Sequence, residues 1–123
     1  MELLFKDESY TIVGICMEVH RILGEGFNEI IYKDALEYEF KQNGVSFERE
    51  RRYTIQYKDT VLPHDYIADF SVYNTVLLEI KAIECLTKSH AKQCLNYLAA
   101  EKLRLALLIN FGEDSLKYQR VVL

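Results

Sequence analysis

Residues 66–81 read YIADFSVYNTVLLEIK, a pattern typical of two short apolar strands joined by a turn at Asn74. Alternation along the first strand, about residues 65–73, separates Asp69 from an apolar face that comprises Ala68, Phe70 and Val72. Alternation along the second strand places Glu79 and Lys81 together, on the face opposite Val76, Leu78 and Ile80. Charged side chains are rarely buried without partners, so two acids and an amine in such strands need an explanation.

The turn decides whether these charges meet. Asp69 and Glu79 share a face if the turn has an odd number of residues, centred on Asn74, or contains a bulge, whereas a two-residue Asn74-Thr75 turn would separate them. Two carboxylates on one face supply the oxygen ligands that Mg²⁺ prefers, and the backbone carbonyl of Ile80 could add a third. A structural salt bridge is the alternative explanation, although a buried ion pair stabilises a sheet weakly.

The amine would act beside such a cation. Lys81 could orient or deprotonate an attacking water, or stabilise negative charge that grows on a phosphate.

The residues before this hairpin predict two helices. Residues 7–23 carry apolar side chains at helical spacing, and Gly24 and Gly26 then end the helix. Asn28 is the expected N-cap of a second helix that runs to about Gln42.

Strand patterns follow the second helix. A strand from Arg51 is predicted with Tyr53, Ile55 and Tyr57 on one face, followed by a Lys58-Asp59 turn.

The residues after the hairpin predict a helix and two more strands. Thr87 caps a third helix to about Glu101, LALLIN at 105–110 is an interior strand, and LKYQRVVL at 116–123 is a last strand. The Glu79 strand, the third helix and LALLIN form a βαβ unit, which predicts parallel strands and a right-handed crossover. The predicted class is α/β, with helices first and a mixed sheet after them.

Composition sets further limits. The chain has 123 residues, half of them apolar, which predicts one domain over residues 1–123. No apolar run approaches the roughly 20 residues that span a bilayer, and the N-terminus lacks the pattern of a secretory signal, so we expect a cytoplasmic protein without membrane contact. The net charge of −4 argues mildly against a general nucleic-acid binder without excluding one. Cys16, Cys85 and Cys94 are expected to be reduced and buried.

Two further motifs support a family resemblance. The segment GFNEIIY, residues 26–32, matches a GxxExxY signature, and Gln93 with Tyr97 matches a QxxxY motif on the helix after ExK. With Asp69 and the Glu79-Ile80-Lys81 triplet, these motifs follow the order of the PD-(D/E)XK nuclease superfamily over residues 10–122. The chain resembles this superfamily, and within it the family named for GxxExxY. Ala68 stands where the superfamily's name has proline.

The resemblance implies a fold and a set of roles. The fold would be a restriction-endonuclease-like mixed β-sheet flanked by helices, with two N-terminal helices, β-hairpins, the crossover and a last strand. Asp69, Glu79 and Glu29 would hold Mg²⁺ or Mn²⁺, Lys81 would serve the nucleophile, and Gln93 would help to position Lys81, the water or a phosphate. The function implied is a metal-dependent nuclease that hydrolyses phosphodiester bonds in DNA or RNA. Many nucleases of this fold act as dimers that cut both strands, so the resemblance also implies a homodimer. The alternative is a catalytically silent module of the same fold that binds nucleic acid or a protein.

Simpler roles compete for several residues. Glu29 lies in the first turn of a helix, where the dipole favours a carboxylate, and Lys33 lies one turn later as a partner. Tyr32 and His20 are expected in the core, whereas His90, on the helix face of Gln93, is expected to touch substrate.

Overall fold

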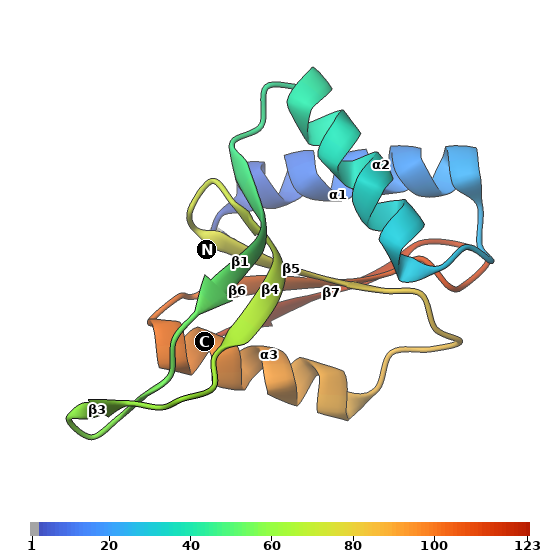
Figure 1. Ribbon diagram of the computed structural model, residues 1–123. Helices are drawn as coiled ribbons and strands as arrows, with labels where there is room; N and C mark the ends of the chain where they lie inside the picture. The colour runs from blue at the N-terminus through green and yellow to red at the C-terminus, as the bar shows by residue number, and fades with distance from the viewer. Residues whose placement is uncertain (1–2) are drawn as a thin grey trace.

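The computed structural model describes residues 3–123 and has the predicted order of helices and strands (Figure 1). Two helices come first, α1 (Lys6–Leu23) and α2 (Glu29–Gln42). The strands that follow are β1 (Phe47–Tyr53), β2 (Gln56–Tyr57), β3 (Thr60–Val61), β4 (Tyr66–Val72) and β5 (Val76–Lys81). The chain then forms α3 (Lys88–Glu101), β6 (Leu105–Asn110) and β7 (Lys117–Val122).

Five strands form one mixed sheet in the order β1-β4-β5-β6-β7. β5 and β6 pair in parallel and are connected through α3, while the other neighbours are antiparallel. This confirms the α/β class and the parallel pair of the βαβ unit. The short β2–β3 hairpin forms a separate ladder and projects away from the sheet (Figure 1).

Helices cover both faces of the sheet (Figure 1). α1 and α2 pack on one face around Phe70, Leu78 and Leu107, and α3 packs on the other around Leu77 and Ala106. All six residues of β6 are buried, as are the first five of β5, because these central strands lie between the helical layers. The two strands therefore form a rigid apolar frame for whatever polar groups they carry.

The helix ends follow the predicted signals in part. Acidic residues occupy the first turn of α1 and basic ones its last, and Gly24, with φ 68°, follows its end. Thr87 and His90 form a capping box at the start of α3. Asn28 precedes α2 as predicted, but its side chain makes no capping hydrogen bond.

One predicted strand was placed wrongly. The strand at Arg51 begins earlier, at Phe47, and ends at Tyr53, so Ile55 and Tyr57 do not continue it. Its pairing with β4 stops at Tyr53↔Tyr66, and the chain beyond pairs with itself in the β2–β3 hairpin, with the predicted turn at residues 58–59. Alternation of large residues across this break does not reveal the change of partner.

The sequence predicts that all three cysteines are buried and reduced. Cys16 and Cys94 are buried as expected, but Cys85 is exposed in the loop before α3, and all three are free thiols. Within residues 3–123, no helix has the length and apolar character needed to cross a membrane.

The loop that leaves β5 is fastened to the end of β6. The side chain of Asn110, fully buried, donates from Nδ2 to the Ile83 carbonyl at 3.0 Å and accepts at Oδ1 from the Ile83 N–H at 3.0 Å. Its Oδ1 also accepts from the Gly112 N–H at 3.0 Å. A Cβ on Gly112 would collide with the backbone of Ile83 and approach the Ala82 carbonyl carbon at 2.7 Å. The segment after Lys81 is thus held by close backbone contact.

Gly112→Ala should therefore destabilise the protein by about 1–3 kcal/mol, because the backbone of Ile83 has to move. Gly14→Ala is the matched control, since nothing lies within 4 Å of its Cβ position and alanine favours helix α1 by about 1 kcal/mol. Thermal or urea unfolding of both variants measures the difference. Equal effects of the two substitutions would contradict the close contact at Gly112.

Candidate active site

The turn between β4 and β5 brings the two predicted acids together. Its register pairs Phe70 with Leu78 and Val72 with Val76, which leaves the three residues 73–75 in the turn. Of the alternatives that the sequence left open, the turn is therefore the odd one centred on Asn74. The same register continued by one step places Asp69 opposite Glu79, where the two strands cease to pair.

Asp69 replaces a backbone carbonyl at this point. Its Oδ2 accepts a hydrogen bond from the Ile80 N–H at 2.7 Å, so the side chain links β4 to β5 after the backbone ladder has ended. This contact also fixes the orientation of the Ile80 peptide, whose carbonyl is the predicted third ligand.

The predicted faces of β4 are partly wrong. Phe70 and Val72 pack on the α1/α2 side, whereas Ala68 packs on the α3 side. Glu50 on β1 lies opposite Asp69, has φ 56°, and forms no pair in the ladder. The side chains of β4 therefore stop alternating regularly between the two faces of the sheet at Asp69. This change lies opposite the distorted backbone of Glu50 on β1.

Glu79 lies on the α3 side and is only 9% exposed. Its Oε1 is buried and has no hydrogen-bond partner among the described residues. Burial, and then the nearby charge of Asp69, raise the pKa of Glu79 to about 9, while the charges of Lys81 and Lys33 oppose this effect. A buried carboxyl with an unsatisfied oxygen is suited to a cation.

Cys94 of α3 adjoins this carboxyl. Burial and then the charge of Glu79 raise the pKa of its thiol, to about 12. It is therefore an apolar cover for the acid and not a thiolate ligand.

Lys33 of α2 is the site residue that sequence reasoning missed. It is 8% exposed, and its Nζ lies 3.0 Å from Asp69 Oδ1 and 3.3 Å from Glu50 Oε1. Burial alone would lower the pKa of Lys33, but the hydrogen bonds and charges of Asp69 and Glu50 raise it above its ordinary value. The available signal was its position three residues before Leu36, on the buried stripe of the helix.

Glu29 forms no ion pair with Lys33, although the sequence offered Lys33 as its partner. It is close enough to Asp69, Lys81 and Lys33 for their charges to shift its pKa. Burial and then the charge of Asp69 raise the pKa of Glu29, while Lys81 and Lys33 lower it by less. Lys81 is half-buried at the end of β5, and its amine forms no ion pair with the carboxylates described in residues 3–123. Lys81 is thus a cation available to an anionic ligand.

Gln93 and His90 are the α3 residues that the sequence assigns to contacts with the substrate or the site. Gln93 is exposed and has no hydrogen bond within the described chain. Helix α3 buries only Cys94 and Leu98, which leaves the neighbouring position in solvent. His90 accepts from the Thr87 N–H at 3.0 Å and so has a structural role as a cap.

Tyr97 is the other residue of the QxxxY motif, and it lies near the two acids. Its ring stacks on Tyr66 with centroids 3.9 Å apart. Burial and then the charge of Glu79 raise its pKa.

Tyr32 and His20 have structural roles, as expected. The Tyr32 hydroxyl donates to the Gly24 carbonyl at 2.6 Å, and its ring stacks on Phe111 at 4.5 Å. His20 Nε2 lies 2.9 Å from the Glu113 carbonyl oxygen. Both residues fasten the loops next to α2 and β6, and Tyr32 thereby fixes the turn that precedes Glu29.

The donors present fit a hard divalent cation with few protein ligands. Among residues 3–123, no three His, Cys, Asp or Glu side chains are arranged to hold a metal ion, so Glu29 does not complete a three-acid set. Mg²⁺ needs fewer, since it keeps several waters and is commonly bound through one or two carboxylates and substrate phosphates. Asp69 and the unsatisfied Oε1 of Glu79 provide these.

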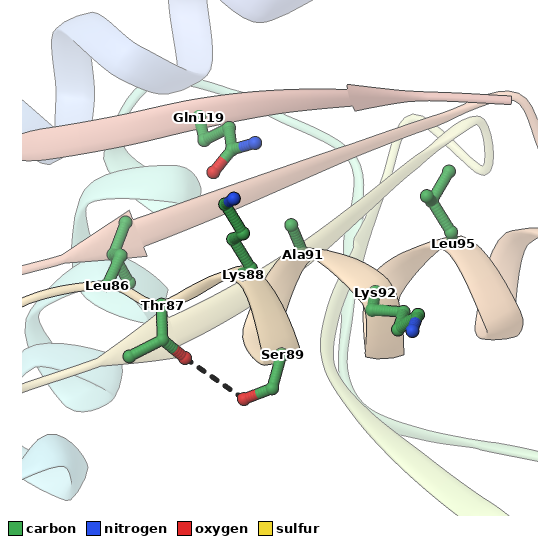
Figure 2. Close-up of a pocket in the computed structure, with 8 residues that line it drawn as sticks. All are labelled: Leu86, Thr87, Lys88, Ser89, Ala91, Lys92, Leu95 and Gln119. Atoms are coloured by element: carbon green, nitrogen blue, oxygen red, sulfur yellow. Dashed lines mark hydrogen bonds between the residues drawn. The ribbon is translucent and has the colours of Figure 1, made fainter.

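The acids do not line the cavity of about 620 Å³ between α3 and β7, which is lined by Lys88, Lys92 and Gln119 among others (Figure 2). The acid pair lies instead where β4 and β5 stop pairing. This position suits a ligand that lies across the two strands better than a small molecule enclosed in a pocket.

Known proteins resemble this chain in sequence family and in fold. A family model described as the PD-(D/E)XK nuclease superfamily matches residues 6–121. No curated protein sequence matched the chain. The crystal structure of SSO0001 is similar in fold, with a TM-score of 0.57 and 20% identity over 75% of this chain. The chain spans only 49% of SSO0001. An alkaline exonuclease from Laribacter hongkongensis is a more distant match, with a TM-score of 0.43 and 14% identity over 99% of this chain and 72% of the exonuclease.

Glu79→Gln should stabilise the protein in the presence of a chelator, and increasingly so as pH rises. The folded protein holds the carboxyl protonated up to about pH 9, whereas the unfolded chain releases the proton near its ordinary pKa. Stability is therefore lost as pH rises from about 4.5 to 9, by at most about 1.4 kcal/mol per pH unit, and glutamine removes this loss. Urea unfolding at several pH values measures it. A difference between variant and wild type that is constant with pH would contradict the burial of this acid.

Lys33→Met should destabilise the protein by about 3 kcal/mol, because it leaves the Asp69 carboxylate without its buried partner. The double variant Lys33→Met/Asp69→Asn should recover part of this loss. Lys41→Met on the same helix is the control, since its 3.5 Å pair with Glu37 is exposed and its loss should change stability by no more than about 0.5 kcal/mol. Equal losses for the two lysines would show that Lys33 is not a buried partner.

Proposed function

The chain belongs to the PD-(D/E)XK nuclease superfamily, and from this premise we propose that it is a divalent-metal-dependent nuclease that hydrolyses phosphodiester bonds in DNA or RNA. The observation that carries the proposal is the acid pair itself. Asp69 and Glu79 lie opposite each other where two strands separate, and one buried oxygen of Glu79 has no partner among the described residues. Burying such a pair costs stability, which is typical of a functional site.

The proposal extends to the GxxExxY family within the superfamily. Its signature places Glu29 at the start of α2, where its charge interacts with Asp69, Lys81 and Lys33. Tyr32 of the signature bonds the Gly24 carbonyl and so supports the turn that leads to Glu29. These contacts give Glu29 and Tyr32 of the motif a physical reason.

Asp69 and Glu79, with the backbone carbonyl of Ile80, would hold Mg²⁺ or Mn²⁺. Both oxygens of Asp69 already accept one hydrogen bond each, and each retains a lone pair for a cation. A bound divalent cation supplies Lewis-acid polarisation of a phosphoryl oxygen and offsets negative charge on the phosphate.

The remaining charges serve the substrate and the water. Lys81 has no carboxylate partner in the described chain, so its ammonium can contact a phosphate oxygen or orient the attacking water. Lys33 fixes the Asp69 carboxylate, and Glu29, whose pKa burial and Asp69 raise, can exchange a proton with a nearby water. Gln93 is exposed on α3 and would act by contacting the substrate backbone.

Labelled single-stranded DNA, duplex DNA and RNA, incubated with the purified chain and Mg²⁺ or Mn²⁺, test the proposal. Wild type should cleave at least one of them, and a chelator should stop cleavage. Asp69→Asn, Glu79→Gln and Lys81→Met should each lower the rate by roughly 100-fold or more while remaining folded. Asp59→Asn, which changes an exposed carboxylate on the β2–β3 hairpin, should cleave as wild type does.

Metal binding gives an independent measurement. Mn²⁺ should raise the melting temperature of the wild type and of Asp59→Asn, but not that of Glu79→Gln. If no polymer is cut and no divalent cation stabilises the wild type, the nuclease proposal fails. Binding of DNA or RNA without cleavage would instead support the catalytically silent module.

A further inference from the structure

The two edges of the sheet are built differently. β1 carries five consecutive charged residues, 48–52, has a left-handed residue at Glu50, and places ion pairs from Arg49 to Asp34 and from Arg52 to Asp65 beside the edge. Charges and distortions of this kind keep other strands from pairing with an edge. β7 has six residues, none with positive φ, and only Lys117 and Arg120 are charged. The β7 edge is therefore open to another strand.

The hydrogen-bond pattern identifies the open groups. The Leu123 N–H donates to the Arg104 carbonyl at 3.0 Å, and Leu105 pairs with Val122. In an antiparallel ladder, alternate residues point their backbone groups to the same neighbour. The N–H and C=O groups of Tyr118, Arg120 and Val122 consequently point away from β6. Tyr118 and Val122 are also 45% and 50% exposed.

A groove lies on each face of this edge strand. The cavity of about 620 Å³ lies between α3 and β7, and Figure 2 shows Lys88 extending from the start of α3 towards Gln119, with Leu86, Ala91 and Leu95 beside it. A second cavity of about 380 Å³ lies between α1 and the other face of β7, next to Tyr118. A strand added to β7 would direct successive side chains alternately into the two grooves.

The charge of both grooves has one sign. Lys88 and Lys92 line the α3 groove, and Lys6 and Arg120 line the α1 groove, while neither contains an acidic residue. Arg120 donates to the Ser9 hydroxyl and the Leu4 carbonyl, both at 2.6 Å, so no carboxylate neutralises it there. In a chain with a net charge of −4, this gathering of cations at one edge favours an anionic occupant.

We propose that the β7 edge is a docking site for an extended acidic segment of a partner protein, which adds a strand to the sheet and places apolar and acidic side chains in the two grooves. The unpaired backbone groups and apolar groove walls match a peptide better than a nucleic-acid strand. A second copy fits poorly, since its β7 carries Lys117 and Arg120 and would add positive charge to an edge that is already cationic. The site lies on the opposite flank of α3 from Tyr97, which adjoins Glu79, and is independent of the nuclease chemistry.

Selection of displayed random peptides of about ten residues, the length of a long strand, tests the proposal on the full chain. The enriched peptides should alternate acidic and apolar residues. A peptide from this set, measured by fluorescence anisotropy, should lose roughly tenfold or more in affinity when every second backbone N–H is methylated, and little when the other set is methylated. This period of two is the signature of strand addition.

Variants of the protein locate the site. Val122→Pro removes one outward N–H and no bond to β6, and should weaken the same peptide roughly tenfold with little change in melting temperature. The double variant Lys88→Glu/Lys92→Glu should weaken it by a similar factor, roughly tenfold. Lys58→Glu, which reverses one charge on the separate β2–β3 hairpin, is a control and should bind as wild type does.

Other outcomes overturn the proposal. If the selection does not enrich acidic peptides, β7 is not a docking edge. The same conclusion follows if Val122→Pro binds the peptide as tightly as wild type does and the two patterns of N-methylation have equal effects. Displacement of the peptide by an oligonucleotide at matched charge concentration would assign the grooves to nucleic acid. A dimer in sedimentation that Val122→Pro dissociates would assign the edge to a second copy. Each result can be read without reference to cleavage activity.

Discussion

The hydrogen bond from the Ile80 backbone N–H to Asp69 Oδ2, 2.7 Å long, determines how the site is assembled. It forms where β4 and β5 stop pairing, so a side chain closes the ladder and a carboxylate is held between two strands. The same bond orients the Ile80 peptide and, through it, the neighbours Glu79 and Lys81. Because β5 continues to pair with β6 beyond this point, the position of these groups depends on the central apolar strands and not on a loop.

The charges around this bond form a layered arrangement. On the α2 side, Lys33 sits between Asp69 and Glu50, and on the α3 side Glu79 faces Cys94 and Tyr97. Lys33 thus compensates Asp69, while Oε1 of Glu79 has no hydrogen-bond partner among the described residues. If Lys33 served both acids, the pair would be a closed salt bridge with no need of a further cation. The proposed metal site needs this asymmetry, whereas a structural ion pair does not.

Local sequence patterns predicted most of the fold and singled out both acids, because helix spacing and strand alternation are local properties. The parallel β5–β6 pair follows from such patterns, whereas the length of the turn at Asn74 was left open and only the strand register decides it. Lys33 could not be assigned in this way, since its partners lie 17 and 36 residues away and only packing of α2 on the sheet brings them together. The change of face at Asp69 likewise depends on the positive φ of Glu50, a residue on another strand.

Burial of the unpartnered acid connects stability with function. Holding Glu79 against α3 raises its pKa to about 9, so the folded state without a cation carries an electrostatic cost that the unfolded chain does not. A divalent cation that binds only the folded state removes this cost and adds its own binding free energy to stability. An acid pair on the exposed edge strands would be solvated and would gain less from the same ion. In the proposed site, the apolar side chains of β5 and β6 would therefore contribute to cation affinity without touching the ion, since they keep water away from the pair.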